Sequence, residues 1–168
     1  MNIDNGNILS LVSLPDFDPN KRENIKDKNY INKITKGVYE LGSVFKTFTL
    51  AAALDENLID VDTKFIDLEK SIDCGKNTIR EYDKKIPKDL TAEEILIRSG
   101  NIGSVRIGQK IGVEKFKQFL TKINLINKIE FDIDEIGIPI PFKWGKCKLA
   151  TTSFGHGITT TPLQLAKG

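Results

Sequence analysis

The sequence places a serine and a lysine one helical turn apart at the start of an apolar stretch. In "YELGSVFKTFTLAAALDEN", residues 39–57, Gly42 and Ser43 precede Lys46. Because residues i and i+3 share a helix face, the Ser43 hydroxyl and the Lys46 amine can meet. Serine is a poor nucleophile until a base takes its proton, and lysine is such a base when burial lowers its pKa. The pattern indicates nucleophilic catalysis, with Gly42 leaving room for a substrate.

The alternative is purely structural. In that interpretation Ser43 caps a helix and Lys46 is a solvated side chain, because a lone Ser-x-x-Lys arises by chance in many chains of this length.

A second cluster of polar side chains supports the catalytic interpretation. Ser99-Gly100-Asn101 lies at the turn between two expected helices, so a hydroxyl and an amide project from one tight loop. Ser99 could relay a proton to a leaving amine, and Asn101 could hydrogen-bond a peptide backbone. The structural alternative is again an N-cap within a helix–helix turn.

The elements that must position these residues are mainly helical. Thr91 and Glu94 form a capping box, and Gly112 separates two helices. Residues 59–90 have no long period and are expected to be irregular, with short extended pieces. The expected helices are Ser43 to about Asn57, Thr91 to about Arg98, Ile102–Ile111, Val113 to about Ile123, a turn or two at Cys147–Ser153, and one starting at Thr161-Pro162.

The beginning of the chain predicts a hairpin. Asn5-Gly6 favours a type I′ turn, and the apolar run 8–14 is typical of a strand buried on both faces. The first arm would hold only about three residues, below the usual strand length. Residues 16–38 are polar and loop-like. We therefore expect a domain cut within this hairpin and again within the last helix.

Composition excludes several classes of function. The 168 residues carry a net charge of +2, from 25 basic and 23 acidic residues, and no basic stripe that would suggest nucleic acid. No run reaches the ~18 apolar residues of a membrane span, and the polar start is unlike a signal peptide. Cys74 and Cys147 match no metal spacing; two unpaired thiols are expected, although an oxidising compartment could pair them.

The motifs together resemble a known family. Ser-x-x-Lys followed by Ser-x-Asn is similar to the opening motifs of penicillin-binding proteins and serine β-lactamases. The flanking segments resemble class B penicillin-binding proteins, most closely the division-specific peptidoglycan D,D-transpeptidase. These segments are "GNILSLVSLPDFDPN", "TKGVYELGSVFKTFTLAAALDENLI", "LTAEEILIRSGNIGSVRIGQKIG" and "LATTSFGHGITTTPLQLAKG".

The resemblance implies a fold and a set of residue roles. The fold would be mixed α/β, an antiparallel sheet flanked by helices, of which residues 1–168 form an incomplete, mainly helical part. Ser43 would be the acylated nucleophile and Lys46 its general base, with Ser99 and Asn101 as proton relay and substrate anchor. The Ser43 N–H would form half of the oxyanion hole. The residues implied to bind substrate are Gly42, Gly155, His156 and Gly157.

The implied activity is the cross-linking of peptidoglycan stem peptides ending in D-Ala-D-Ala, with β-lactams acylating the same serine. No metal or organic cofactor and no nucleic acid are expected. Division and cell-wall proteins would be partners, and an N-terminal anchor outside these residues would hold the protein at the periplasmic face of the inner membrane. The alternatives are a β-lactamase or D,D-carboxypeptidase, a non-catalytic penicillin sensor, and a structural or interaction protein unrelated to the family.

The sequence also departs from the family. The third motif, Lys-Thr-Gly, is absent; Lys143-Trp144-Gly145 lies too early, and its tryptophan is expected to fill a pocket. Leu41 replaces the usual proline, Gly100 the usual serine, and His156 the usual tyrosine or glutamine, so His156 is expected to line the site rather than act as a base.

Because the third motif is missing, the 168 residues alone are expected to be inactive and marginally folded. The apolar faces of Val44, Phe48 and the 102–111 helix would be left exposed.

Overall fold

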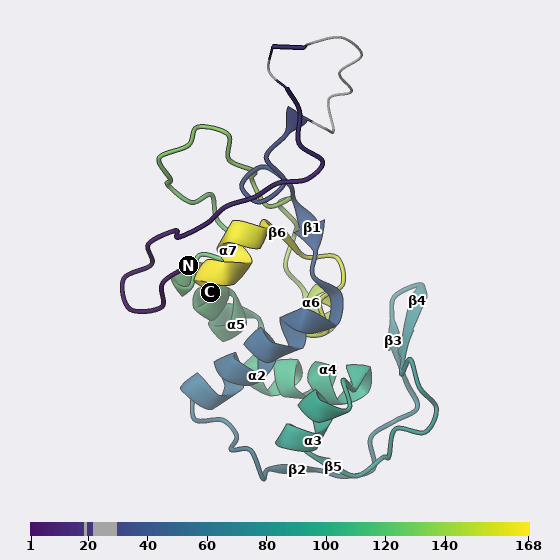
Figure 1. Cartoon of the computed structure of the whole chain (residues 1–168). Coiled ribbons are helices and arrows are strands. Elements are labelled where there is room, and N and C mark those ends of the chain that lie inside the picture. Colours follow the sequence, from purple (N-terminus) through teal and green to yellow (C-terminus); the bar gives the residue numbers. More distant parts are fainter. Residues whose placement is uncertain (19, 22–29) are drawn as a thin grey trace. The chain divides into compact units, whose positions relative to one another are not determined.

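The computed structural model describes residues 1–18, 20–21 and 30–168, which form two compact units (Figure 1). Unit 1 consists of Met1–Tyr39, Thr121–Pro141 and Thr159–Gly168. Unit 2 consists of Glu40–Leu120 and Phe142–Ile158 and contains every residue of the predicted site. Two short strands, β1 (Tyr39–Glu40) and β6 (Thr159–Thr160), lie where the chain passes from one unit to the other.

Unit 2 is mainly helical, as predicted. A 3₁₀ turn, η1, leads directly into α2, and α5 ends just inside unit 1. The helical elements are η1 (Gly42–Phe45), α2 (Lys46–Asp55), α3 (Ala92–Ile97), α4 (Asn101–Ile111), α5 (Val113–Lys122) and α6 (Lys146–Ser153).

Local signals explain where these helices begin and end. At the start of α3 the Thr91 hydroxyl accepts from the Glu94 N–H at 3.1 Å, and the Glu94 carboxylate accepts from the Thr91 N–H at 2.9 Å. Gly112 ends α4 with a φ of 79°, a conformation that glycine adopts without steric cost. The predicted capping box and the predicted stop at Gly112 are therefore confirmed.

Helices α2, α4 and α6 pack together around the core of unit 2. Small residues allow this close approach: a Cβ on Gly108 of α4 would overlap the Ser153 hydroxyl of α6. The buried Thr49 hydroxyl donates to the Ser153 carbonyl at 2.8 Å and ties α2 to α6. The larger fully buried apolar side chains of this core are Phe45, Ile95, Ile102, Val105, Phe116, Leu120 and Ile158.

This core corrects the expectation of exposed apolar faces. Phe48 is only 9% exposed, and Ile102, Val105, Ile107 and Ile111 of α4 are buried by neighbouring helices of the same unit. Val44, at 54% exposure, is the one member of the predicted set that stays open to solvent.

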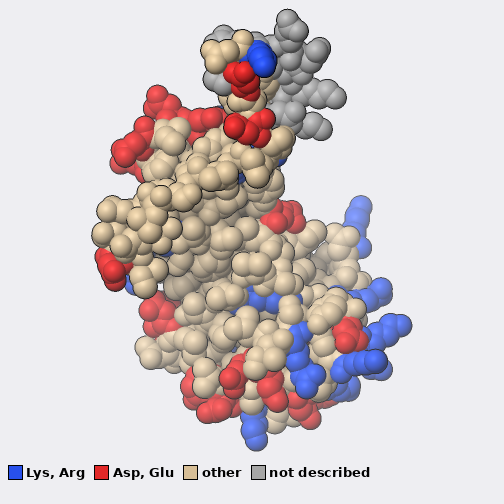
Figure 2. All heavy atoms as spheres, viewed as in Figure 1, with Lys and Arg blue, Asp and Glu red and all other residues tan. Residues whose placement is uncertain are grey.

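Between α2 and α3 the chain forms the short extended pieces that were predicted. Strand β3 (Ser71–Cys74) pairs antiparallel with β4 (Asn77–Arg80) around a turn at Gly75, with Ile72 opposite Ile79. Two-residue strands β2 (Lys64–Phe65) and β5 (Leu90–Thr91) form a second antiparallel pair. On the face shown in Figure 2, lysine and arginine atoms gather where Figure 1 draws β3 and β4.

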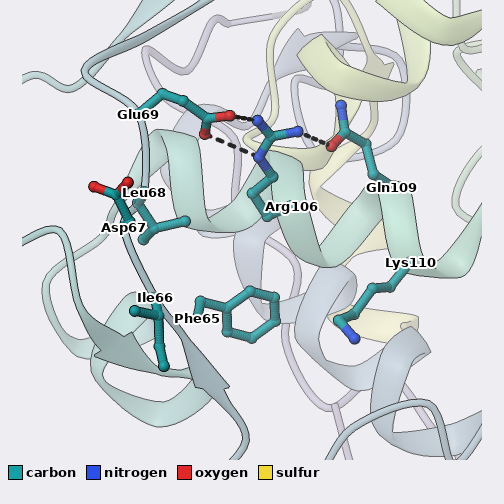
Figure 3. A pocket seen from close by; sticks show the side chains of 8 residues that line it. All are labelled: Phe65, Ile66, Asp67, Leu68, Glu69, Arg106, Gln109 and Lys110. Atoms are coloured by element: carbon teal, nitrogen blue, oxygen red, sulfur yellow. Dashed lines mark hydrogen bonds and ion pairs between the residues drawn. The ribbon is translucent and has the colours of Figure 1, made fainter.

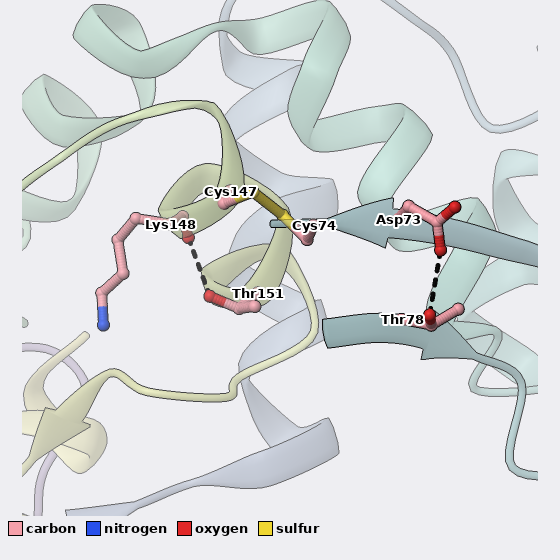
Figure 4. The surroundings of a disulfide bond; sticks show 6 residues. All are labelled: Asp73, Cys74, Thr78, Cys147, Lys148 and Thr151. Atoms are coloured by element: carbon pink, nitrogen blue, oxygen red, sulfur yellow. Dashed lines mark hydrogen bonds between the residues drawn. A yellow bond between two sulfur atoms is a disulfide. The ribbon is translucent and has the colours of Figure 1, made fainter. Parts of the chain in front are cut away.

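The prediction of two unpaired thiols is wrong. Cys74, at the end of β3, and Cys147, in the first turn of α6, form a disulfide with their Cα atoms 5.2 Å apart (Figure 4). The two cysteines are separated by 73 positions, so no local spacing could indicate the pairing. The bond links the β3–β4 hairpin to α6 within unit 2.

Unit 1 differs from the predicted hairpin. Asn2 and Asn7 are joined by a backbone hydrogen bond of 2.8 Å around a turn at Gly6, but residues 8–14 form no strand. Leu9, Val12 and Leu14 are exposed, because no neighbouring strand among the described residues pairs with this segment. Of the predicted loop 16–38, Pro19 and residues 22–29 lie outside the described residues.

The last helix, α7 (Pro162–Lys167), anchors the small core of unit 1. As predicted, Thr161 caps it, with a capping box to Gln164. The Gln164 amide also donates to the Asn124 and Asn127 carbonyls at 2.8 and 2.7 Å. Leu163 of α7 forms a buried apolar cluster with Ile129 and Ile136. Within the described ranges, no helix combines the length and apolar character that a bilayer span requires.

Candidate functional site

Lys46 is the centre of the candidate site. It is the first residue of α2, and only 2% of its surface is exposed. Its amine donates to the Ser99 carbonyl at 2.5 Å, the Ser99 hydroxyl at 3.0 Å and the Asn101 side-chain oxygen at 2.7 Å. The structure therefore brings Lys46, Ser99 and Asn101 together from positions more than fifty residues apart.

The environment of this amine changes its basicity. Burial lowers the pKa of Lys46 from 10.5 to about 8, and the negative charge of Glu81 partly opposes the shift. With a pKa of about 8, roughly a tenth of the amine is unprotonated at neutral pH. An ordinary exposed lysine would supply almost no free base under the same conditions.

Ser43 lies one turn before Lys46, in η1, and its side chain is exposed. The Ser43 carbonyl accepts from the backbone N–H of Lys46 and so fixes the step from η1 into α2. The expected contact between the Ser43 hydroxyl and the Lys46 amine is not among the hydrogen bonds of unit 2, where the amine is bound by Ser99 and Asn101. Ser43 is thus exposed, whereas the Lys46 amine one turn later is buried and bound.

Ser99 and Asn101 occupy the sharp turn between α3 and α4. Ser99 has a φ of 53°, a left-handed conformation that is uncommon for residues other than glycine. Asn101 is the first residue of α4, and its amide nitrogen donates to the Arg80 carbonyl at 2.8 Å. Its side chain is thus engaged at both ends, which leaves one N–H and one lone pair for a further partner.

Glu81 belongs to this cluster and was missed by the sequence analysis. It follows β4 directly, and its carboxylate accepts from the Asn101 N–H at 2.6 Å and the Ile102 N–H at 2.9 Å. The residue sits in a stretch without periodicity, so no pattern in the sequence singles it out. Only the folded chain brings it to the start of α4.

The two predicted glycines Gly42 and Gly155 contact each other. Gly42 has a φ of 56°, and a Cβ there would meet open space, so it needs glycine for its conformation. Gly155 is buried with a φ of 85°, and a Cβ there would overlap the Gly42 carbonyl and lie 2.8 Å from the Phe45 Cβ. The segment after α6 therefore packs directly against the turn that carries Ser43.

His156 and Gly157 lie further along the same segment. The exposed His156 ring has its Nδ1 3.4 Å from a Glu40 carboxylate oxygen. The Gly157 carbonyl accepts from the Lys148 amine, which also lies 4.0 Å from the centre of the Phe142 ring. Burial lowers the pKa of Lys148, with Glu40 opposing the shift. No hydrogen bond or ion pair in unit 2 joins His156 or Gly157 to the Lys46 cluster.

One hollow of unit 2 is lined in part by Arg80 and Glu81, and another lies away from the Lys46 cluster. Figure 3 shows the second, between β2 and α4, where the Arg106 guanidinium is held by Glu69 and by the Gln109 side-chain oxygen. It includes none of the predicted site residues. Trp144, predicted to fill a pocket, packs against Phe142 and Phe116 with ring centres 4.9 and 6.4 Å apart. Among the described residues no cluster of side chains could hold a metal ion.

These features define a class of mixed α/β protein. An exposed serine lies one turn before a buried lysine at the start of a helix, and a Ser-x-Asn turn accepts hydrogen bonds from the lysine amine. The model of the family described as "Penicillin binding protein transpeptidase domain" matches residues 1–168. The chain therefore belongs to this family.

Named relatives agree with the family. The "Probable peptidoglycan D,D-transpeptidase FtsI" of Caulobacter vibrioides is 34% identical over 99% of this chain and 28% of its own length. The "Stage V sporulation protein D" of Bacillus subtilis is 31% identical over 98% of this chain and 26% of its own length. The chain thus spans little more than a quarter of either relative.

A solved structure shows the same fold. Pseudomonas aeruginosa PBP2, in complex with WCK 5153, matches with a TM-score of 0.82 over 96% of this chain and 42% of that chain, at 19% identity. The predicted mixed α/β fold of the penicillin-binding type is therefore confirmed.

Proposed function

We propose that this chain carries the acylation site of a peptidoglycan D,D-transpeptidase. The observation that carries the proposal is the buried Lys46 amine, one turn after Ser43 and bound by Ser99 and Asn101. A buried lysine with a pKa of about 8 is matched to accept a proton near neutral pH. Membership of the transpeptidase family supports the same reaction.

In the proposed reaction Ser43 Oγ attacks the carbonyl carbon of the D-Ala-D-Ala bond while its proton passes to the Lys46 amine. The backbone N–H of Ser43 stabilises the developing oxyanion. The C–N bond then breaks, and the leaving D-Ala amine receives a proton through Ser99, whose hydroxyl lies 3.0 Å from the Lys46 amine. The acyl group remains on Ser43 until an amine of a second stem peptide takes it.

The other predicted residues have supporting roles in this proposal. The free N–H and lone pair of Asn101 would hold the substrate backbone. The contacts with Arg80 and Lys46 fix the orientation of the Asn101 side chain. Gly42 would let the substrate approach Ser43 closely, Gly155 would hold the Ser43 turn, and His156 and Gly157 would line the site. A β-lactam would acylate Ser43 by the same attack.

At the level of the whole protein, we propose that residues 1–168 form part of a transpeptidase domain. The relatives extend well beyond the matched part, and residues outside it would supply the Lys-Thr-Gly motif and half of the oxyanion hole. The protein would act in cell division at the periplasmic face of the inner membrane, held by an N-terminal anchor and assembled with other division proteins.

The test is labelling of the protein at its full natural length with a fluorescent penicillin. The Ser43→Ala variant should lose labelling, whereas Ser71→Ala, which changes an exposed serine on β3, should keep it. Unchanged labelling of Ser43→Ala would reject the nucleophile assignment. Stable label would speak against the β-lactamase alternative, whereas rapid release of the label into water would favour it.

A further inference from the structure

The start of α4 is held by a carboxylate from a distant part of unit 2. Glu81 accepts from the backbone N–H of Asn101 through one oxygen and from that of Ile102 through the other, at 2.6 and 2.9 Å. These are two of the four N–H groups that a helix start leaves without an intrahelical partner. The N-cap residue, Gly100, has no side chain to serve them. Glu81 therefore replaces the missing cap.

Glu81 and its neighbour Arg80 link the β3–β4 hairpin to the Lys46 cluster through Asn101. The preceding residue, Arg80, accepts from the Asn101 amide through its carbonyl. Residues 80 and 81 thus hold both the backbone and the side chain of Asn101, and the Asn101 oxygen in turn accepts from Lys46. A shift of Glu81 would be transmitted to the groups that bind the lysine amine.

We propose that Glu81 is a positioning residue for the Ser43–Lys46 site: its carboxylate fixes the start of α4 so that Asn101 and Ser99 face the Lys46 amine, and its charge acts on that amine. This inference rests on the proposed function. Ser99 and Asn101, which bind the amine, are neutral, whereas the negative charge of Glu81 favours the protonated form of Lys46.

Removal of the charge has a defined direction. The Glu81 charge favours protonated Lys46, so the Glu81→Gln variant should have a lower Lys46 pKa than the parent value of about 8. We expect the titration midpoint to move to lower pH, because the charge that opposes the effect of burial is gone. The pH at which acylation by a penicillin is half-maximal should fall by the same amount. A role limited to helix stability would leave both midpoints unchanged.

The experiment follows the ¹³C resonance of Lys46 Cε through a pH titration of the full-length protein. Glu114→Gln is the control, because it removes the same charge from an exposed position in the first turn of α5. Glu81→Asp separates the two effects: it keeps the charge but shortens the side chain. This variant should retain a Lys46 pKa near the parent's, whereas amide exchange at Asn101 and Ile102 should become faster.

Each outcome decides the proposal. An unchanged Lys46 titration in Glu81→Gln, or the same shift in Glu114→Gln, would overturn it. If Glu81→Gln does not fold, exchange at Asn101 and Ile102 in Glu81→Asp decides: faster exchange supports the proposal, and parent-level exchange contradicts it. The Lys46 titration needs no penicillin, so a parent protein that is never acylated would reject the proposed function and leave the Glu81 result readable.

Discussion

At the scale of single residues, the environment of Lys46 sets the basicity of its amine. Three oxygen acceptors hold the amine in one orientation, and burial makes its charged form costly. Loss of the proton would weaken the donors that now face Ser99 and Asn101, and would leave the amine free to accept from Ser43. The lowered pKa and the neutral acceptors thus suit the proposed exchange of a proton between Ser43, Lys46 and Ser99.

This environment predicts how acylation depends on pH. Below pH 8 the free base of Lys46 decreases about tenfold per pH unit, so the acylation rate should decrease in the same proportion and level off above pH 8. Lys46→Arg keeps the charge but cannot deprotonate, and should reduce acylation by at least about 100-fold. Stopped-flow labelling across pH 6–10 provides the measurement, with thermal unfolding to check the variant's fold. Parent-level acylation of Lys46→Arg would assign Lys46 a structural role only.

At the scale of elements, the turn that carries Ser43 depends on close packing from the end of α6. Gly155 has no room for a side chain because the Gly42 carbonyl lies where its Cβ would be. At the opposite end of α6, the disulfide ties the helix to the β3–β4 hairpin, whose Arg80 carbonyl accepts from the Asn101 amide. Helix α6 thus has contacts at its two ends with the turn that carries Ser43 and with the β3–β4 hairpin.

Gly155→Ala tests the first of these contacts. Gly75→Ala is a matched control, because Gly75 also has a positive φ, of 65°, but open space around its Cβ. The control should lose only the ~1 kcal/mol of a strained backbone, whereas Gly155→Ala should lose at least about 2 kcal/mol and most of the acylation rate. Urea unfolding of both variants gives the comparison. Equal losses would mean that the Gly42–Gly155 contact adjusts without cost.

The disulfide should stabilise unit 2. It closes a loop with a sequence separation of 73, and such bonds typically contribute about 2–4 kcal/mol by restricting the unfolded chain. Reduction should lower the urea midpoint of the parent protein and leave that of the Cys74→Ser/Cys147→Ser double variant unchanged. If the reductant has no effect on the parent, or shifts the double variant equally, the bond contributes nothing to stability.

At the scale of the whole molecule, the two units differ in the size of their cores. Unit 2 buries the interlocked side chains of α2, α4 and α6, whereas the core cluster of unit 1 contains three buried residues, one of them in α7. Stability is not uniform across a chain built in this way, because segments with fewer buried contacts open at lower free energy. We therefore expect the Lys46 cluster to stay intact when unit 1 opens.

Amide hydrogen exchange measures this difference directly. The central amides of α4 should exchange at least about tenfold more slowly than those of α7, because α4 lies within the larger core of unit 2. Equal protection in the two helices would show that the units unfold together.

The earlier expectation that residues 1–168 alone are inactive stays a prediction. Labelling of this piece beside the full-length protein with fluorescent penicillin checks it.

The sequence by itself determined the features that depend on neighbours along the chain. The Ser43–Lys46 spacing, the Thr91 capping box and the helix stop at Gly112 each involve residues within one turn, where local geometry decides the outcome. The order of the motifs also indicated the family, which the match over residues 1–168 confirmed.

Only the tertiary structure decided the contacts between distant segments. Glu81 meets Asn101 across 20 positions, Lys46 meets Ser99 across 53, and Cys74 meets Cys147 across 73. No short pattern encodes such pairs, because they depend on how the β3–β4 hairpin and the helices of unit 2 pack together. The same dependence explains the wrong strand prediction for residues 8–14: an apolar run becomes a strand only where a neighbouring strand binds its backbone, and the described residues place none beside it.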